Sequence, residues 1–155
     1  MSTDIQYLTS DKFAEIKRDL EILKTDKRKE VAEHLEYAKK LGDLSENAEY
    51  HQAREEQAEV ENRIGRLEQL LKNAVIADSH GGEVVTIGST VRVEKNGDNK
   101  SMVFTIVGSE EADTSNGKIS NLSPLGSALL GRKQGDKVKV MTPKGGTEYV
   151  VGAVK

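Results

Sequence analysis

The chain has 155 residues, of which 35% are hydrophobic, 32% are charged and 4% are aromatic, a composition that suits long helices with much of their surface in water. The net charge of −3 argues against a protein that coats nucleic acid by bulk attraction, and the lack of Cys excludes disulfides and thiolate chemistry. Neither a signal pattern nor an apolar stretch long enough to cross a bilayer occurs, so we expect a cytoplasmic protein with no membrane partner.

The first half of the sequence predicts two long helices. Between about Thr9 and Leu41 there is neither Pro nor Gly, and from Ser45 to Asn73 the only Gly is Gly65. Apolar residues recur three and four apart in both stretches, which predicts two helices packed antiparallel as a coiled-coil hairpin on the order of 45 Å long. A hairpin this long and only two helices thick has little core of its own. This indicates that its purpose is to carry the turn far from the rest of the chain. The first seam is Phe13, Ile16, Leu20, Leu23, Val31, Leu35, Ala38 and Leu41, with Lys27 where another apolar residue would fall; the second is Tyr50, Ala53, Gln57, Val60, Ile64, Leu67, Leu71 and Ala74.

A basic run, residues 24–29 (KTDKRK), lies part-way along the first helix. Two interpretations are open on sequence alone. The run is either a solvated face with ion pairs inside the helix, or a patch that contacts phosphate.

The ten residues from Gly42 to His51 turn the chain between the two helices. Gly42 fits the left-handed residue that ends a helix. Asp43 and Glu46 have the spacing of a capping box at the start of the second helix, and Ser45 is a competing N-cap. Helix capping is therefore sufficient to explain why these acids lie in the turn. In the alternative, Asp43 and Glu46 point outward as hard oxygen ligands. Two carboxylates are too few to hold Mg²⁺ alone, but they could complete a site in a partner.

The second half predicts a small sheet domain. Twelve of the 14 glycines lie from Gly81 onward, and Ser79-His80-Gly81-Gly82 predicts a joint between domains 1–77 and 78–155. Asn96-Gly97 predicts a type I′ hairpin, and Ser123 is placed to cap a short helix over Pro124 to Leu130. The expected architecture is α+β, with antiparallel strands and one helix. The strands are expected at residues 83–87, 89–94, 102–107, 118–120, 136–141 and 147–154.

Few residues indicate chemistry within the chain itself. His34, His51 and His80 lack metal-ligand spacing, and the sequence has no phosphate loop and no Ser–His–Asp signature. We therefore expect no stand-alone active site and no cofactor of the chain's own.

The segment Gly42-Asp43-Leu44-Ser45-Glu46-Asn47-Ala48-Glu49-Tyr50-His51 matches the signature of bacterial Gre transcript cleavage factors. The chain resembles their GreA type over essentially its whole length. The resemblance includes Glu55-Glu56-Gln57, Ile119-Ser120, Ser123-Pro124 and the Thr142-Pro143-x-Gly145-Gly146 turn. It implies an N-terminal antiparallel coiled coil and a C-terminal domain with an FKBP-like fold. Prolyl isomerase activity would be inferred only from the analogy with that fold, and fold analogy is weak evidence for function.

The resemblance also implies a function. The protein would be a transcription elongation factor that docks on RNA polymerase and inserts its coiled coil into the secondary channel. Asp43 and Glu46 would help the polymerase hold its second Mg²⁺, so that the polymerase cleaves the 3′ end of a backtracked RNA. The basic residues facing the nascent RNA would be Lys24, Lys27, Arg28, Lys39 and Lys40. The tip would be supported by Ser45, Asn47, Tyr50 and Arg54, of which Tyr50 and Arg54 would alternatively contact the polymerase active site. Ser123 and Pro124 would dock on the polymerase.

Two residues depart from the family pattern. Leu122 stands where the family usually has a polar or acidic residue, and Lys29 replaces a common proline, which predicts a more regular first helix. Inhibitory relatives alter the tip acids, whereas Asp43 and Glu46 are both present here, so we expect an active factor. The alternative is a polymerase-binding inhibitor or adaptor that occludes the channel without inducing cleavage.

Overall fold

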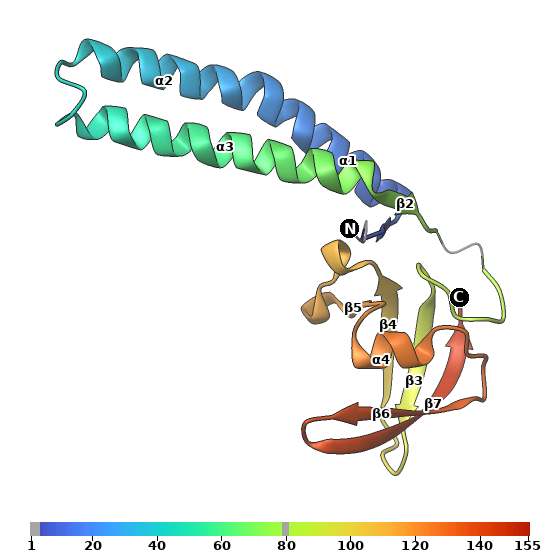
Figure 1. The fold of residues 1–155 in the computed structure, drawn as a ribbon. Coiled ribbons are helices and arrows are strands. Elements are labelled where there is room, and N and C mark those ends of the chain that lie inside the picture. The colour runs from blue at the N-terminus through green and yellow to red at the C-terminus, as the bar shows by residue number, and fades with distance from the viewer. Residues whose placement is uncertain (1–3, 79–80) are drawn as a thin grey trace. The chain divides into compact units, whose positions relative to one another are not determined.

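The computed structural model describes residues 4–78 and 81–155; Ser79 and His80 of the predicted joint lie outside the described residues. The chain divides into two compact units (Figure 1). One unit is Phe13–Asn73, and the other joins Met1–Lys12 to Ala74–Lys155. Residues 4–12, which include the first turn of α1, therefore belong with the sheet unit and not with the hairpin.

The first unit is the predicted helical hairpin (Figure 1). Its first arm consists of α1 (Ser10–Ile22), a π-helical segment (Leu23–Lys27) and α2 (Arg28–Lys40), and its second arm is α3 (Ala48–Lys72). The apolar seam is buried as predicted at four positions of the first arm and two of the second, and Leu70 is buried in addition. The seam residues are Ile16, Leu23, Val31, Ala38, Ala53 and Ile64.

The π-helical segment lies where the predicted seam loses an apolar residue. Leu23 and Val31 are eight residues apart, which would turn them about 80° from each other on a regular α-helix. A π turn holds one residue more than an α turn, so it restores the phase, and both residues are buried while Lys27 is exposed. The first arm is therefore not a regular α-helix throughout, although Lys29 itself lies in regular α2.

The second unit contains a five-stranded sheet in the order β5-β4-β3-β7-β6. The strands are β3 (Thr90–Lys95), β4 (Ser101–Val107), β5 (Lys118–Ser120), β6 (Lys137–Thr142) and β7 (Gly145–Val154). Three pairs are antiparallel, but β4 and β5 are parallel. The sheet is therefore mixed, because the chain from β4 to β5 returns through two short 3-10 turns, Ser109–Glu111 and Thr114–Asn116, and not through a hairpin.

Helix α4 (Pro124–Leu129) lies across one face of this sheet (Figure 1). It begins as predicted, with the Ser123 hydroxyl accepting a hydrogen bond from the Gly126 N–H at 3.0 Å. The helix and the sheet enclose a single cluster of buried apolar residues: Val85, Val91, Val93, Ile106, Ile119, Leu129, Val138 and Val151.

Two local predictions for this unit were incomplete. A type I′ turn needs positive φ at both central residues, yet of Asn96 and Gly97 only Gly97 has it, at 85°, and five residues separate β3 from β4. The unit also contains a parallel pair that the sequence does not predict, β1 (Gln6–Leu8) with β2 (Ala74–Ile76). Strands of three residues are too short to show the alternation of apolar and polar residues that identifies a strand. The helical spacing therefore assigns Ala74, the first residue of β2, to the end of the second helix.

None of the helices described in the two units is both long enough and apolar enough to cross a membrane.

Gly65 offers a test of how the hairpin is stabilised. It lies inside α3, and a methyl group built on it would meet no atom of the described residues within 4 Å. Glycine inside a helix costs about 0.5–1 kcal/mol relative to alanine. We expect Gly65→Ala to raise the free energy of unfolding of the hairpin by about that amount, measured by urea unfolding with far-UV circular dichroism.

The matched control is Gly126→Ala in α4. A Cβ on Gly126 would lie 2.0 Å from the Ser120 carbonyl oxygen, so this substitution should destabilise the sheet unit. A loss of stability in Gly65→Ala, as in Gly126→Ala, would contradict the assignment of Gly65 as an open helix position.

Candidate functional site at the hairpin tip

The loop from Leu41 to Asn47 joins α2 to α3 and forms the tip of the hairpin. Helix α2 ends at Leu41, whose N–H donates to the Ala38 carbonyl at 3.1 Å. Gly42 follows with a φ of 128°, a conformation that side chains disfavour, as the sequence predicted for this position. The chain can therefore leave α2 sharply and return within a few residues.

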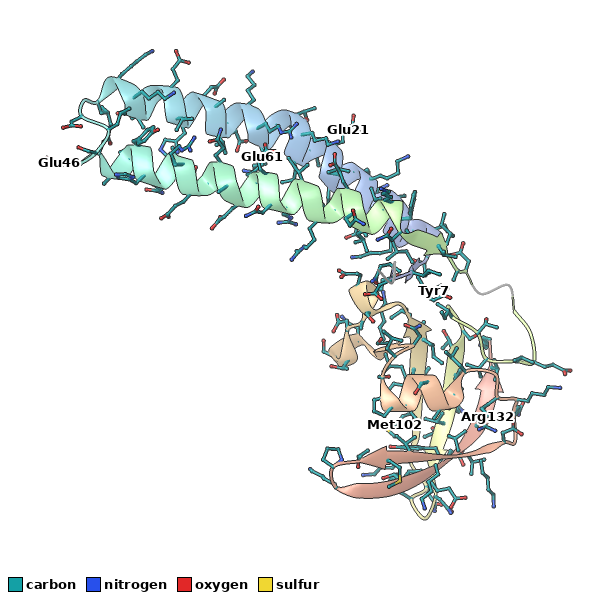
Figure 2. The ribbon with its side chains drawn as sticks, viewed as in Figure 1. Tyr7, Glu21, Glu46, Glu61, Met102 and Arg132 are labelled. Atoms are coloured by element: carbon teal, nitrogen blue, oxygen red, sulfur yellow. The ribbon has the colours of Figure 1, made fainter. Side chains whose placement is uncertain are left out.

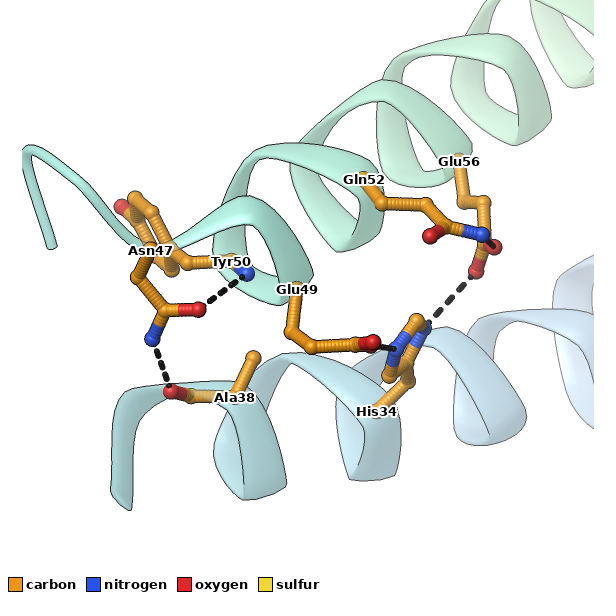
Figure 3. A network of polar contacts seen from close by, with 7 residues as sticks. All are labelled: His34, Ala38, Asn47, Glu49, Tyr50, Gln52 and Glu56. Atoms are coloured by element: carbon orange, nitrogen blue, oxygen red, sulfur yellow. Dashed lines mark hydrogen bonds and ion pairs between the residues drawn. The ribbon is translucent and has the colours of Figure 1, made fainter. Parts of the chain in front are cut away.

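Asn47 closes the hairpin through both ends of its side-chain amide (Figure 3). Its Oδ1 accepts from the Tyr50 N–H at 3.1 Å and caps α3, while its Nδ2 donates to the Ala38 carbonyl at 2.6 Å. The prediction that Asp43 or Ser45 caps the second helix was wrong. Helix α3 begins only at Ala48, and Asn47 alone combines an acceptor for α3 with a donor for the last turn of α2.

Asp43 is an exposed carboxylate that its own loop holds in place. Its Oδ1 accepts from the Ser45 N–H at 3.0 Å and from the Ser45 hydroxyl at 2.9 Å. These bonds, the backbone one first, lower the pKa of the Asp43 carboxyl below its usual value. The group is therefore ionised at neutral pH, and neither helix uses it as a cap.

Glu46 projects from the end of the hairpin (Figure 2). It is exposed, and within residues 4–78 and 81–155 no hydrogen bond or ion pair engages its carboxylate. The tip therefore presents two carboxylates of different character. Asp43 is held by Ser45, whereas Glu46 is free to adjust.

The residues predicted to support the tip are only partly brought together. His51 Nε2 lies 3.2 Å from the Ser45 carbonyl, and the His51 ring meets Tyr50 edge-on with ring centroids 5.9 Å apart. Ser45, Asn47 and Tyr50 thus form one contact network at the tip. Arg54 lies one turn further along α3 and donates to Gln57 at 3.1 Å.

All four cations of the basic run form ion pairs, the longest being that of Lys29 with Glu33 at 4.0 Å. Arg28 grips Glu61 of α3 with two bonds of 2.8 and 2.9 Å, Lys24 pairs with Glu68 of α3, and Lys27 binds Glu30 at 2.7 Å. Two of these pairs join the two arms, which the idea of pairs inside one helix did not anticipate. All are exposed, and such pairs are worth about 0–1 kcal/mol each, so the cations remain exchangeable.

The two lysines nearest the tip are less engaged. Lys40 lies 3.6 Å from Glu36 across a solvent-exposed turn, and Lys39 has no ion-pair partner in the part of the chain that the structure describes. They leave a small positive region on α2 directly behind the acids.

The tip offers too few ligands to hold a metal by itself. Across the described residues, no cluster of three or more His, Asp or Glu side chains is arranged to bind an ion. Asp43 and Glu46 are nevertheless hard oxygen donors of the kind that Mg²⁺ prefers. Such a pair can add to a site whose other ligands come from elsewhere.

The predicted docking residues lie on the second unit, at the start of α4. The Ser123 hydroxyl donates to the Ser120 carbonyl at 2.6 Å in addition to capping α4, so this serine is a structural residue in the isolated chain. Pro124 is exposed, and the neighbouring Leu122 is 77% exposed. This corner therefore presents an apolar side chain on a rigid turn.

Comparison with known proteins gives a consistent result along the whole chain. Residues 6–76 match a family described as transcription elongation factor, N-terminal, and residues 79–155 match transcription elongation factor, GreA/GreB, C-term. The chain is 46% identical to transcription elongation factor GreA of Bacillus cereus (strain AH187) and 44% identical to that of Clostridium acetobutylicum, with full coverage of both chains in each case. Among solved structures, GreA factor homolog 1 of Thermus thermophilus is 32% identical, with 97% of this chain and 98% of that chain covered and a TM-score of 0.43.

The dual role of Asn47 can be tested by substitution. Asn47→Ala removes the cap and the bond to Ala38, so we expect the hairpin to lose about 1–2 kcal/mol of its free energy of unfolding. Urea unfolding followed by far-UV circular dichroism measures this loss.

Asn47→Ser is the matched control, because a hydroxyl can still cap α3 but cannot reproduce the amide bond to Ala38. We expect it to recover part of the loss. If Asn47→Ala unfolded like the wild type, the amide would not be what closes the hairpin.

Proposed function

Because the chain belongs to the GreA/GreB family of transcription elongation factors, we propose that it binds RNA polymerase and stimulates the polymerase's own cleavage of the 3′ end of backtracked RNA. In this proposal the hairpin enters the secondary channel, and arrested complexes resume elongation once the RNA has been cut. The observation that carries the proposal is that Asp43 and Glu46 are exposed at the end of the hairpin, while Asn47 supplies the helix cap.

The two acids would act as ligands supplied to the polymerase. A Mg²⁺ ion shared with the polymerase active site would activate water and stabilise an in-line phosphoryl displacement. Asp43 is suited to this because it is already ionised and held by Ser45. Glu46 has no bond within the described chain to give up, so it can move to complete the site. The chain would have no active site of its own, since the remaining ligands belong to the partner.

Other surfaces would support this action. Lys39 and Lys40 lie on α2 just behind the tip and would face the extruded 3′ end of the RNA. Lys24, Lys27 and Arg28 would reach RNA phosphates only by exchanging their present glutamate partners. On the second unit, Ser123 and Pro124 would contact the polymerase, with exposed Leu122 beside them.

Isosteric removal of the tip charges tests the proposal. We expect Asp43→Asn and Glu46→Gln each to reduce stimulated cleavage in a stalled, backtracked complex by at least about tenfold. Substituting a residue that only hydrogen-bonds to a metal ligand already lowers activity by about 10- to 100-fold, and a ligand should matter at least as much. Both variants should still compete with the wild type for polymerase. The measurement is release of 3′ RNA fragments.

Glu21→Gln is the matched control, since Glu21 is an exposed acid on α1, near the other end of the same hairpin. It should cleave like the wild type. Normal cleavage by the double variant Asp43→Asn/Glu46→Gln would refute the ligand role. If the wild type suppresses elongation without releasing fragments, the chain is an occluding inhibitor.

A further inference from the structure

A second cluster of titratable groups joins the two arms of the hairpin a short way behind the tip (Figure 3). His34 of α2 lies with its ring between two carboxylates of α3. Its Nδ1 is 3.0 Å from Glu56 Oε2, and its Nε2 is 3.1 Å from Glu49 Oε2. The Gln52 amide donates to the other oxygen of Glu56 at 3.4 Å. The His34 side chain is 27% exposed, the least exposed member of these pairs.

The protonation state of His34 decides whether both contacts can exist together. A neutral imidazole has one N–H, and its other nitrogen carries a lone pair that would face a carboxylate oxygen with no proton between them. Only the imidazolium donates from both nitrogens. Both contacts are therefore hydrogen bonds only when the ring is protonated, and a neutral ring can donate to one of the two glutamates.

We propose that His34 is a positioning residue that forms a proton-dependent clasp, holding the first turn of α3 against α2 behind the tip acids. Glu49 lies two residues after the cap Asn47 and three residues after Glu46. When the clasp is closed, the start of α3 is fixed at two points, the Asn47 amide and Glu49. When His34 loses its proton, Glu56 keeps the remaining bond, because it is the nearer partner at 3.0 Å and is also bound by Gln52. Glu49 then separates from α2, and the Asn47 amide is the polar link left at the start of α3.

The charges around His34 favour the protonated form. Lys27, Glu30, Glu56 and Glu59 line one hollow of about 470 Å³ with His34, and Lys27 is bound to Glu30 at 2.7 Å. Glu56 and Glu59 come from α3, Glu30 comes from α2, and Glu49 faces the ring from the tip side. Hydrogen bonds to Glu56 first and Glu49 second raise the pKa of His34 above its ordinary value of 6.5.

A raised pKa fixes the direction of the effect. The stabilisation by the clasp is fully present below about pH 6.5, where the unfolded chain is also protonated, and it is lost as the pH rises through the pKa of the folded state. The hairpin should therefore melt at a lower temperature as the pH increases above 6.5.

The test uses the full chain without polymerase. NMR titration should show His34 with a pKa above 6.5 and with both ring nitrogens protonated at the acid end. The melting midpoint of the hairpin should fall across the same pH range, and His34→Gln should abolish this fall. His51→Gln is the matched control, because it removes a second tip histidine outside the clasp and should keep the fall. A His34 pKa at or below 6.5, or a fall that persists in His34→Gln, would overturn the clasp.

A second variant separates the two halves of the contact. Glu49→Gln leaves Glu56 in place, so it should lower the pKa of His34 and increase amide hydrogen exchange in the first turn of α3 at low pH. Unchanged exchange there would show that Glu49 does not hold the helix start.

The consequence for RNA cleavage rests on the proposed function. The ratio of cleavage by the wild type to that by His34→Gln should fall towards one as the pH rises through the His34 pKa, since the clasp is then open in both. A constant ratio with a confirmed titration would refute the positioning role while leaving the proposed function intact. Failure of the wild type to stimulate cleavage at any pH would instead refute the proposed function.

Discussion

The side-chain amide of Asn47 is the interaction on which the tip depends. A hairpin of two helices must turn within a few residues, and the turn leaves orphan carbonyls at the end of one helix and orphan N–H groups at the start of the other. Asn47 caps an N–H of α3 at 3.1 Å and gives the Ala38 carbonyl of α2, already bonded to the Leu41 N–H, a second donor at 2.6 Å, so it joins the two helix ends directly. Because a neutral residue does this, neither of the acids beside it is needed as a helix cap.

This division of labour gives the tip its chemical character. If Asp43 or Glu46 capped α3, its carboxylate would be engaged by backbone N–H groups of that helix. Instead Asp43 is bonded only within its loop, by Ser45, and Glu46 has no bond in the described chain. Further back, the arms are joined by charged groups as well as by the seam, through Arg28 with Glu61, Lys24 with Glu68 and the His34 cluster. The buried apolar seam holds the two arms together, and these polar contacts add to it along the length of the hairpin.

Many features of the fold could be predicted because they have periodic or local signals. The heptad spacing identified both arms, and the Ser123-Pro124 pair identified the start of α4. The parallel β1–β2 pair, the parallel placement of β5 and the turn at Asn96-Gly97 could not be predicted in this way. Each depends on where a distant segment lies, and three-residue strands carry too little pattern to reveal it.

The sequence by itself determined that this chain has a long hairpin with Asp43 and Glu46 at its turn, because helical spacing and the signature residues are written in consecutive positions. Only the tertiary structure decided which residue caps the second helix, since Asp43, Ser45 and Asn47 all have acceptors and the choice depends on reaching the Ala38 carbonyl on the other arm. The same holds for His34, whose neighbours Glu49 and Glu56 are 15 and 22 residues away in the chain. Such contacts follow from the register of one helix against the other, which no single segment specifies.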